Sequence, residues 1–270
     1  MSTALAMIPY TNMAPYRQLG APAGCHFVPL VPRASIEALL RNQVAAAAVP
    51  VGGLPQLGDT VEMVGRFGIA AKGPCMSVLL FSRVPFEAMQ APRTLRVTTE
   101  TASSMRLLYL LLGRTHGFDS LPRLAAADEP ADAELLIGDR ALLRGAAVEA
   151  GDEFFHVTDL AEKWFDIHAL PFVFARWVVR KDAPQKVKQA LARWLDEFKA
   201  DEALLAARAV DASARTLGVD NDLVERYFNV IRRCLDDSDM EGQRCFSREL
   251  EQFGRQPLFQ SSRRQALETD

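Results

Sequence analysis

The first residue that could do chemistry is an amide in a short loop near the N-terminus. Residues 8–16 read IPYTNMAPY, where a strand-like start breaks at Thr11-Asn12 and the loop ends at Pro15. An asparagine at a strand end offers both a donor and an acceptor to a polar ligand in a cleft. The same position suits an Asx turn, in which the side chain bonds its own backbone, and spacing alone favours that turn.

A second candidate is a group of hydroxyl residues directly before an amphipathic helix. Free backbone N–H groups and the helix dipole make such a start attractive to a carboxylate, and hydroxyls add donors without adding charge. Simple N-capping by Thr101 or Ser103 is the alternative, and it is compatible with ligand binding. The hydroxyl residues are Thr98, Thr99, Thr101, Ser103 and Ser104.

A third candidate is the Ile137-Gly138-Asp139 turn, which follows a predicted buried strand. Ligands of α/β sheets tend to bind where strands end, and a glycine there permits a positive φ or a close backbone approach. Asp139 is equally suited to capping the following helix.

The histidines give little support to metal or nucleophile chemistry. None pairs with a second histidine or a carboxylate at a spacing such as HExxH, and the chain has no nucleophile elbow or glycine-rich phosphate loop. His168 falls at a predicted helix end, where a cationic imidazole would favour the helix C-terminus. We therefore expect no metal and no cofactor.

Composition indicates an ordinary globular protein. The 270 residues carry a net charge of −3, so nucleic acid is not an expected partner, and the pairs Arg232-Arg233 and Arg263-Arg264 are expected to be solvated. No export signal and no apolar run of about 18 residues is visible, which predicts a cytoplasmic protein without membrane insertion. The four cysteines are expected to be reduced and mostly buried.

These candidates need strands and helices to position them. Periodicity predicts a parallel sheet covered on both faces, with Ser35 capping a helix over 36–43. The chain after Pro184 is predicted to be wholly helical, including residues 221–235. Strands are predicted at 25–31, 45–51, 67–71, 76–82, 94–99, 133–139 and 172–180, and a short helix at 159–170.

The order of these elements permits a two-lobed α/β protein. Two long apolar strands, 76–83 and 172–180, bracket the middle α/β segment. If each crosses between lobes, residues 1–83 and 178–270 form one lobe and residues 84–177 form the other. A cleft between the lobes would then bind a small carboxylate ligand.

Five segments, taken together, resemble the chorismate dehydratases of menaquinone biosynthesis by the futalosine route. The resemblance covers nearly the whole chain, and IGDRAL combined with the DL…W…LPFVFA run is its most specific part. The segments are YTNMAPY (10–16), GPCMSVLLFS (73–82), TASSMRLLYLLL (101–112), LLIGDRALL (135–143) and VTDLAEKWFDIHALPFVFARW (157–177).

The resemblance implies a fold like that of type II periplasmic binding proteins, without export. It also implies a hydro-lyase that eliminates water from chorismate to give 3-[(1-carboxyvinyl)oxy]benzoate. Aromatisation of the ring drives this step, so precise holding of the leaving hydroxyl supplies most of the catalysis. The general base is not evident, and a carboxylate of the substrate could serve.

The resemblance also assigns roles to residues by position. Asn12 is the catalytic candidate and would hydrogen-bond the ligand. The hydroxyls of Thr101, Ser103 and Ser104 would bind a carboxylate. Ser77, Asp139 and His168 complete the predicted substrate-binding set, with Asp139 orienting the substrate rather than moving a proton.

Two departures from the family pattern bear on the substrate. His168-Ala169 stands where the family usually has Thr-Gly, and Pro50-Val51-Gly52-Gly53 stands where a serine-bearing turn is common. The His168-Ala169 change leaves a re-specialised or non-catalytic paralogue as an alternative. Two others are 1,4-dihydroxy-6-naphthoate synthase, which shares the fold and pathway although IGDRAL and LPFVFA argue against it, and a binding protein without catalysis.

Overall fold

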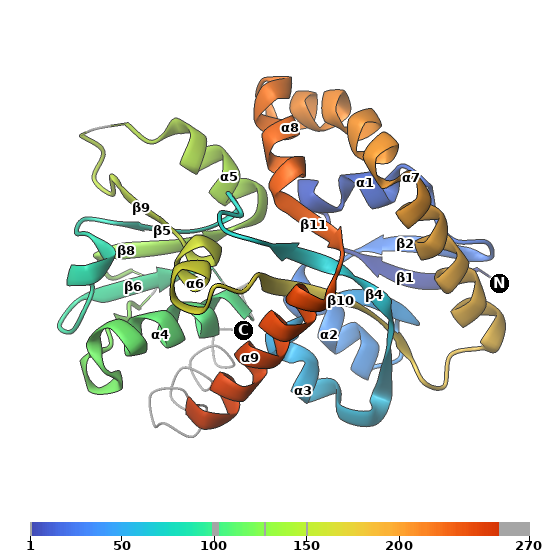
Figure 1. Ribbon diagram of the computed structural model, residues 1–270, viewed down its shortest axis with the longest axis horizontal. Coiled ribbons are helices and arrows are strands. Elements are labelled where there is room, and N and C mark those ends of the chain that lie inside the picture. The colour runs from blue at the N-terminus through green and yellow to red at the C-terminus, as the bar shows by residue number, and fades with distance from the viewer. Residues whose placement is uncertain (1, 99–102, 127, 150, 254–270) are drawn as a thin grey trace. The chain divides into compact units, whose positions relative to one another are not determined.

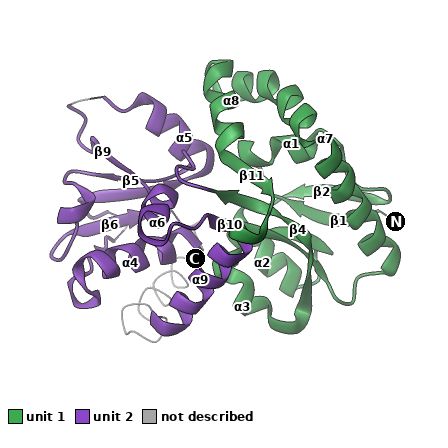
Figure 2. Cartoon of the chain, in the orientation of Figure 1, with its two compact units in different colours: residues 1–71, 173–239 green, residues 72–172, 240–270 purple. Residues whose placement is uncertain are grey.

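The chain folds into two compact α/β units, each built from two separate stretches of sequence. The computed structural model describes residues 2–98, 103–126, 128–149 and 151–253. Unit 1 contains residues 1–71 and 173–239, and unit 2 contains residues 72–172 and 240–270 (Figure 2). The chain therefore passes between the units three times.

Unit 1 is built on a mixed six-stranded sheet (Figure 1). The strand order is β11-β4-β10-β3-β1-β2, in which β1 is parallel to β2 and β3 while β10 and β11 run antiparallel to their partners. The strands are β1 (Thr3–Met7), β2 (Cys25–Pro29), β3 (Ala46–Pro50), β4 (Val61–Ala71), β10 (Phe172–Arg180) and β11 (Ile231–Cys234).

Helices cover both faces of this sheet, because its strands carry apolar side chains on each side (Figure 1). The 33-residue helix α7 places one apolar stripe on the sheet. The helical segments of unit 1 are η1 (Thr11–Met13), α1 (Ala14–Arg17), α2 (Pro32–Leu40), η2 (Val51–Gly53), α3 (Leu54–Leu57), η3 (Gly58–Thr60), α7 (Gln185–Leu217) and α8 (Asn221–Val230).

An aromatic cluster joins the first loop of unit 1 to α7 and β10. The buried Tyr16 ring stacks on Phe198 with centroids 3.9 Å apart, and it lies 5.8 Å from Trp177 and 5.7 Å from Trp194. Such rings bury large apolar areas in a fixed geometry. The loop that carries Asn12 is thereby attached to the core.

Unit 2 is built on a mixed five-stranded sheet with the order β7-β6-β8-β5-β9. Strands β6, β7 and β8 are parallel, and β5 runs antiparallel to both β8 and β9. The strands are β5 (Val78–Ser82), β6 (Thr94–Val97), β7 (Arg123–Leu124), β8 (Ala133–Ile137) and β9 (His156–Asp159).

The helices of unit 2 include the C-terminal helix. Helix α5 packs on β5 and β8, and α4 contacts α6. Helix α9 approaches the backbone before β10 so closely that a Cβ on Gly242 would lie 2.0 Å from the Pro171 carbonyl oxygen. The helical segments are η4 (Phe86–Ala88), α4 (Ser103–His116), η5 (Phe118–Ser120), α5 (Gly138–Ala147), α6 (Leu160–His168) and α9 (Asp237–Phe253).

The predicted division of the chain differs from this one. It placed 1–83 with 178–270 and left 84–177 as the other lobe, whereas the units change at residues 71 and 172 and residues 240–270 fall in unit 2. The reason is that β5 pairs with β8 and β9 in the second sheet, while the apolar face of α9 packs in unit 2 through Phe246. Two crossings were expected and there are three.

Several predicted elements also need correction. Both sheets are mixed rather than parallel. Helix α2 starts at Pro32, and the Ser35 hydroxyl donates back to the Val31 carbonyl instead of capping the helix. The helix predicted over 221–235 ends at Val230, and the chain continues as strand β11. The four cysteines are free, as expected, but Cys75 alone among them is buried.

The described part of the chain holds no helix that is both long and apolar enough to cross a membrane.

The residue that ends α6 leads to a prediction about stability. Ala169 closes the helix with φ +53°, a left-handed conformation that costs a residue with a Cβ about 1–2 kcal/mol and glycine very little. Ala169→Gly should therefore raise the free energy of unfolding by about 0.5–1 kcal/mol, measured by urea denaturation. The matched control is Ala207→Gly, an exposed site inside α7, which should lower it by about 1 kcal/mol. If both substitutions changed the free energy of unfolding in the same direction, the left-handed geometry assigned to Ala169 would be contradicted.

Candidate functional site

The topology of unit 2 brings several predicted residues to one edge of its sheet. Strands β6 and β8 are parallel neighbours, so α4, which follows β6, and α5, which follows β8, both start at that edge. Strand β5 runs the other way and begins there, with Val78 opposite Ile137. Ligands of α/β sheets bind at such carboxyl ends of strands.

The start of α4 is the position best suited to an anion. Ser103 and Ser104 lie in its first turn and are buried, with 4% and 6% of their surfaces exposed. No acidic residue lies in that turn, so the positive end of the helix dipole is not already neutralised there. Thr101, the third predicted hydroxyl residue, lies outside the described residues.

The Gly138-Asp139 turn forms the start of α5 at the same edge. Gly138 adopts φ +62°, in agreement with the expectation for this glycine. Asp139 lies in the first turn, and the N-cap position belongs to Ile137, which has no side-chain cap. The carboxylate of Asp139 therefore remains a candidate for orienting a substrate, and the N-cap alternative is wrong.

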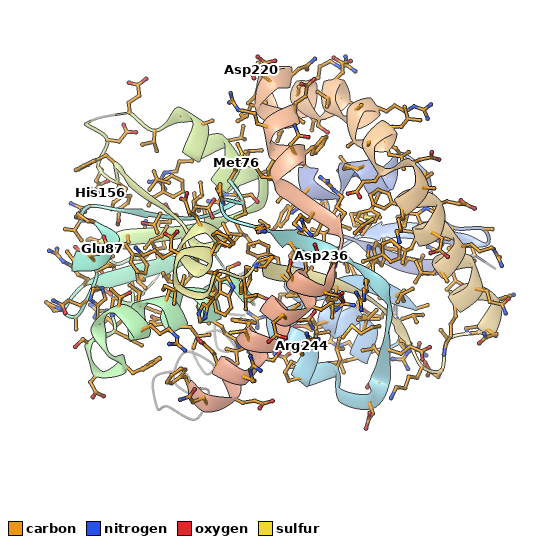
Figure 3. The ribbon with its side chains drawn as sticks, viewed as in Figure 1. Met76, Glu87, His156, Asp220, Asp236 and Arg244 are labelled. Carbon is orange, nitrogen blue, oxygen red and sulfur yellow. The ribbon has the colours of Figure 1, made fainter. Side chains whose placement is uncertain are left out.

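Ser77 joins this group through a backbone hydrogen bond. The Gly138 N–H donates to the Ser77 carbonyl at 2.8 Å, which places the residue before β5 beside the turn after β8. The Ser77 side chain is 3% exposed. The preceding residue, Met76, has φ +61° and is labelled in Figure 3. A methionine backbone with a positive φ is strained, so neighbouring groups must stabilise it.

Asp159 supplies that support, and the sequence analysis missed it. Its Oδ2 accepts hydrogen bonds from the Cys75 N–H at 2.8 Å and the Met76 N–H at 2.7 Å. Its Oδ1 caps α6 by accepting from the N–H groups of Ala161 and Glu162. Burial raises the pKa of Asp159, although the N–H donors oppose the shift. The signal available was an aspartate directly before a helix, at the N-cap position.

In unit 1 the loop that carries Asn12 is held by side chains from α1 and β11. The Tyr16 hydroxyl donates to the Arg233 carbonyl at 3.1 Å. Arg17 Nη1 donates to the Ile8 carbonyl at 3.1 Å, and Arg233 Nε donates to the Asn12 carbonyl at 3.0 Å. The Asn12 backbone is thereby fixed.

The side-chain oxygen of Asn12 makes no hydrogen bond within its own loop. Its Oδ1 is buried and accepts no hydrogen bond in the described structure. The Asx turn that spacing favoured is therefore wrong. A buried carbonyl oxygen without a donor is costly in a native fold and is a reason to consider a ligand.

His168 is not brought to the edge that carries Ser77 and Ser103. It ends α6, nine residues from the Asp159 cap, a distance of about 13 Å along the helix. Its ring packs on Trp164 with centroids 3.8 Å apart, and Nε2 lies 3.5 Å from a Glu249 carboxylate oxygen. Burial lowers the pKa of His168, so the expected cationic imidazole at the helix end is wrong in direction.

His168, Cys245 and Glu249 are a group that could hold a metal ion. One donor atom from each lies within 4.8 Å of the others. The carboxylate of Glu249, however, already accepts from Arg114 through Nε at 2.9 Å and through Nη2. A divalent cation would have to bind beside that guanidinium, so the residues do not form a convincing metal site.

The comparisons with known proteins agree with this architecture. A family model described as menaquinone biosynthesis matches residues 3–252. The chain belongs to the menaquinone biosynthesis family. A chorismate dehydratase of Thermus thermophilus is 30% identical over 255 residues, which is 89% of this chain and 92% of that protein.

Solved structures with similar folds include a ligand-binding protein. Protein AF1704 of Archaeoglobus fulgidus has a TM-score of 0.70 at 15% identity and covers 94% of this chain and 98% of its own. The alkanesulfonate-binding protein SsuA of Xanthomonas axonopodis pv. citri has a TM-score of 0.63 at 12% identity, covering 93% and 92%. The predicted periplasmic-binding-protein-like α/β fold is confirmed. A shared cleft for Asn12 and Ser103 stays a prediction.

Asp159 provides the first prediction from this site. Asp159→Ala should lower the free energy of unfolding by at least about 2 kcal/mol, because several backbone N–H groups lose their acceptor. The matched control is Asp220→Ala, an N-cap that serves one N–H of α8 and should cost about 1 kcal/mol. Chemical denaturation measures both. A smaller loss for Asp159 than for Asp220 would contradict its assigned role.

The buried environment of His168 leads to a prediction about how stability depends on pH. The folded-state pKa of His168 is below its ordinary value of about 6.5, so the unfolded chain binds more protons in the interval between the two values. Stability should therefore decrease as the pH falls through 6.5, and His168→Gln should reduce that dependence. Denaturation at a series of pH values measures it.

Proposed function

We propose that this protein is a chorismate dehydratase, which removes water from chorismate to form 3-[(1-carboxyvinyl)oxy]benzoate. The observation that carries the proposal is the 30% identity to a chorismate dehydratase over 89% of the chain, within the menaquinone biosynthesis family. The residues at the sheet edge of unit 2 support it by their chemistry. Chorismate carries two carboxylates, and this edge offers neutral donors.

The start of α4 is the proposed carboxylate site. Ser103 and Ser104 would donate from their hydroxyls, and the first-turn N–H groups would add the positive end of the dipole. Such donors bind an anion without pairing it with a full positive charge, which would lower the basicity of a substrate carboxylate. Ser77 lies at the same edge, held there by its hydrogen bond with Gly138.

Asn12 is the proposed hydrogen-bonding residue in unit 1. Its buried Oδ1 is free to accept from a substrate hydroxyl, and its backbone is fixed by Arg233. Elimination with aromatisation needs the leaving hydroxyl held in one orientation, which a rigid amide can do. The base that takes the ring proton would be a carboxylate of the substrate itself.

The test is incubation of the purified protein with chorismate. We expect a new aromatic absorbance and a product lighter by one water, identified by mass spectrometry. Asn12→Ala should lower kcat about 100-fold, because a preorganised polar contact to the reacting groups is lost. Ser104→Ala should mainly raise KM, by about 5–10-fold, because a carboxylate contact is lost.

Two variants serve as controls for these measurements. Asn229→Ala changes an exposed asparagine on α8, and Ser35→Ala changes a buried serine that bonds a helix carbonyl. Both should keep wild-type turnover. Chorismate that binds but stays unchanged would contradict the proposal and favour a binding protein without catalysis. Wild-type turnover in Asn12→Ala would remove that residue from the site.

A further inference from the structure

Strand β11 carries an arginine into the interior of unit 1. Its residues alternate between buried and half-buried positions, as expected when successive side chains point to opposite sides of a strand. Arg232 lies on the outer side and is paired with Asp236 and Asp239. Arg233 lies on the inner side and is 2% exposed. The expectation of a solvated Arg232-Arg233 pair is therefore wrong for Arg233.

The charge of Arg233 is poorly compensated. Its Nη1 donates to the carbonyls of Ile231 at 3.1 Å and Phe228 at 3.3 Å, which are neutral acceptors. The carboxylate that faces it belongs to Glu202, and the distance between Nη1 and Oε1 is 3.8 Å. Burial lowers the pKa of Arg233, and Glu202 opposes that shift. A buried cation without a close carboxylate is unfavourable and calls for an explanation.

Two residues that share a hydrogen bond each have one buried side-chain atom without a partner. Nη2 of Arg233 donates to no described residue, and Oδ1 of Asn12 accepts from none. The 3.0 Å hydrogen bond from Arg233 Nε to the Asn12 backbone carbonyl joins the two residues. The first atom needs an anionic acceptor and the second needs a hydroxyl or N–H donor.

We propose that Arg233 and Asn12 form an anion-binding subsite that takes a carboxylate on Nη2 and a hydroxyl of the same ligand on Oδ1. The ligand class is a small hydroxy-carboxylic acid with both groups on one six-membered ring. The assignment of chorismate as that ligand rests on the proposed function, whereas the subsite itself does not. Arg233 thus becomes a substrate-binding residue in unit 1, as the start of α4 is proposed to be in unit 2.

The experiment compares three probe ligands that do not react. 3-Hydroxybenzoate offers both groups, 3-hydroxybenzamide replaces the carboxylate with a neutral amide, and benzoate lacks the hydroxyl. Affinities are measured by isothermal titration calorimetry. Arg233→Gln should weaken 3-hydroxybenzoate at least about tenfold, because a charge-assisted hydrogen bond is lost, and should change 3-hydroxybenzamide less than about threefold. Arg233→Lys should lie between Arg233→Gln and the wild type.

Asn12 is tested with the hydroxyl. Wild-type protein should prefer 3-hydroxybenzoate to benzoate, and Asn12→Ala should remove that preference. The control for the lost positive charge is Arg226→Gln, at an exposed site on α8, which should leave all three affinities unchanged. Equal affinity of wild type and Arg233→Gln for 3-hydroxybenzoate, with both proteins folded by circular dichroism, would overturn the subsite.

The wild-type protein gives a second test that does not depend on any variant folding. A crystal structure with 3-hydroxybenzoate should place a carboxylate oxygen within hydrogen-bond distance of Arg233 Nη2, and a ligand bound elsewhere overturns the subsite. The two proposals fail separately. Chorismate that binds through Arg233 without losing water refutes only the activity. Turnover with an unchanged KM in Arg233→Gln refutes only the subsite.

Discussion

Buried loops depend on side chains for their backbone hydrogen bonds, and that constraint shapes the predicted site regions in both units. Where a strand ends, its neighbours no longer supply partners, and water does not reach the interior. In unit 2 the Asp159 carboxylate takes up the N–H groups of Cys75 and Met76. In unit 1 the Arg233 guanidinium takes up the carbonyl of Asn12. Asp159 thereby fixes the backbone just before Ser77, and Arg233 fixes the backbone of Asn12 itself.

Much of the fold could be predicted from local patterns, because the strands are short apolar runs. The predicted strand 172–180 coincides with β10, and most others differ by a few residues at their ends. Strand β11 could not be found in this way. Its four residues follow a helical pattern without a break, and the conformation is decided by pairing with β4, which lies far earlier in the sequence. Because this strand was not predicted, the inward direction of the Arg233 side chain was not predicted either.

The candidate site was predictable where chemistry depends on residue type and place along a strand. Ser77 and Gly138 are far apart in sequence, yet both flank strands that pair, so the sheet brings them together. Asp159 was missed because an N-cap aspartate is common, and only the packed structure shows that its second oxygen holds another loop. The charge expected for His168 was wrong because the ring is buried, which its place at a helix end does not reveal.

The His168-Ala169 departure from the family pattern involves two residues with different structural roles. Ala169 occupies a left-handed position at the end of α6, where its cost is conformational. His168, its neighbour, instead packs on Trp164 and faces Glu249, away from the sheet edge that carries Ser103 and Ser104. A change at these two positions therefore alters the stability of unit 2 before it alters the polarity of that edge. Specificity is better sought in the groups whose hydrogen bonds are incomplete, which in unit 1 are Asn12 and Arg233.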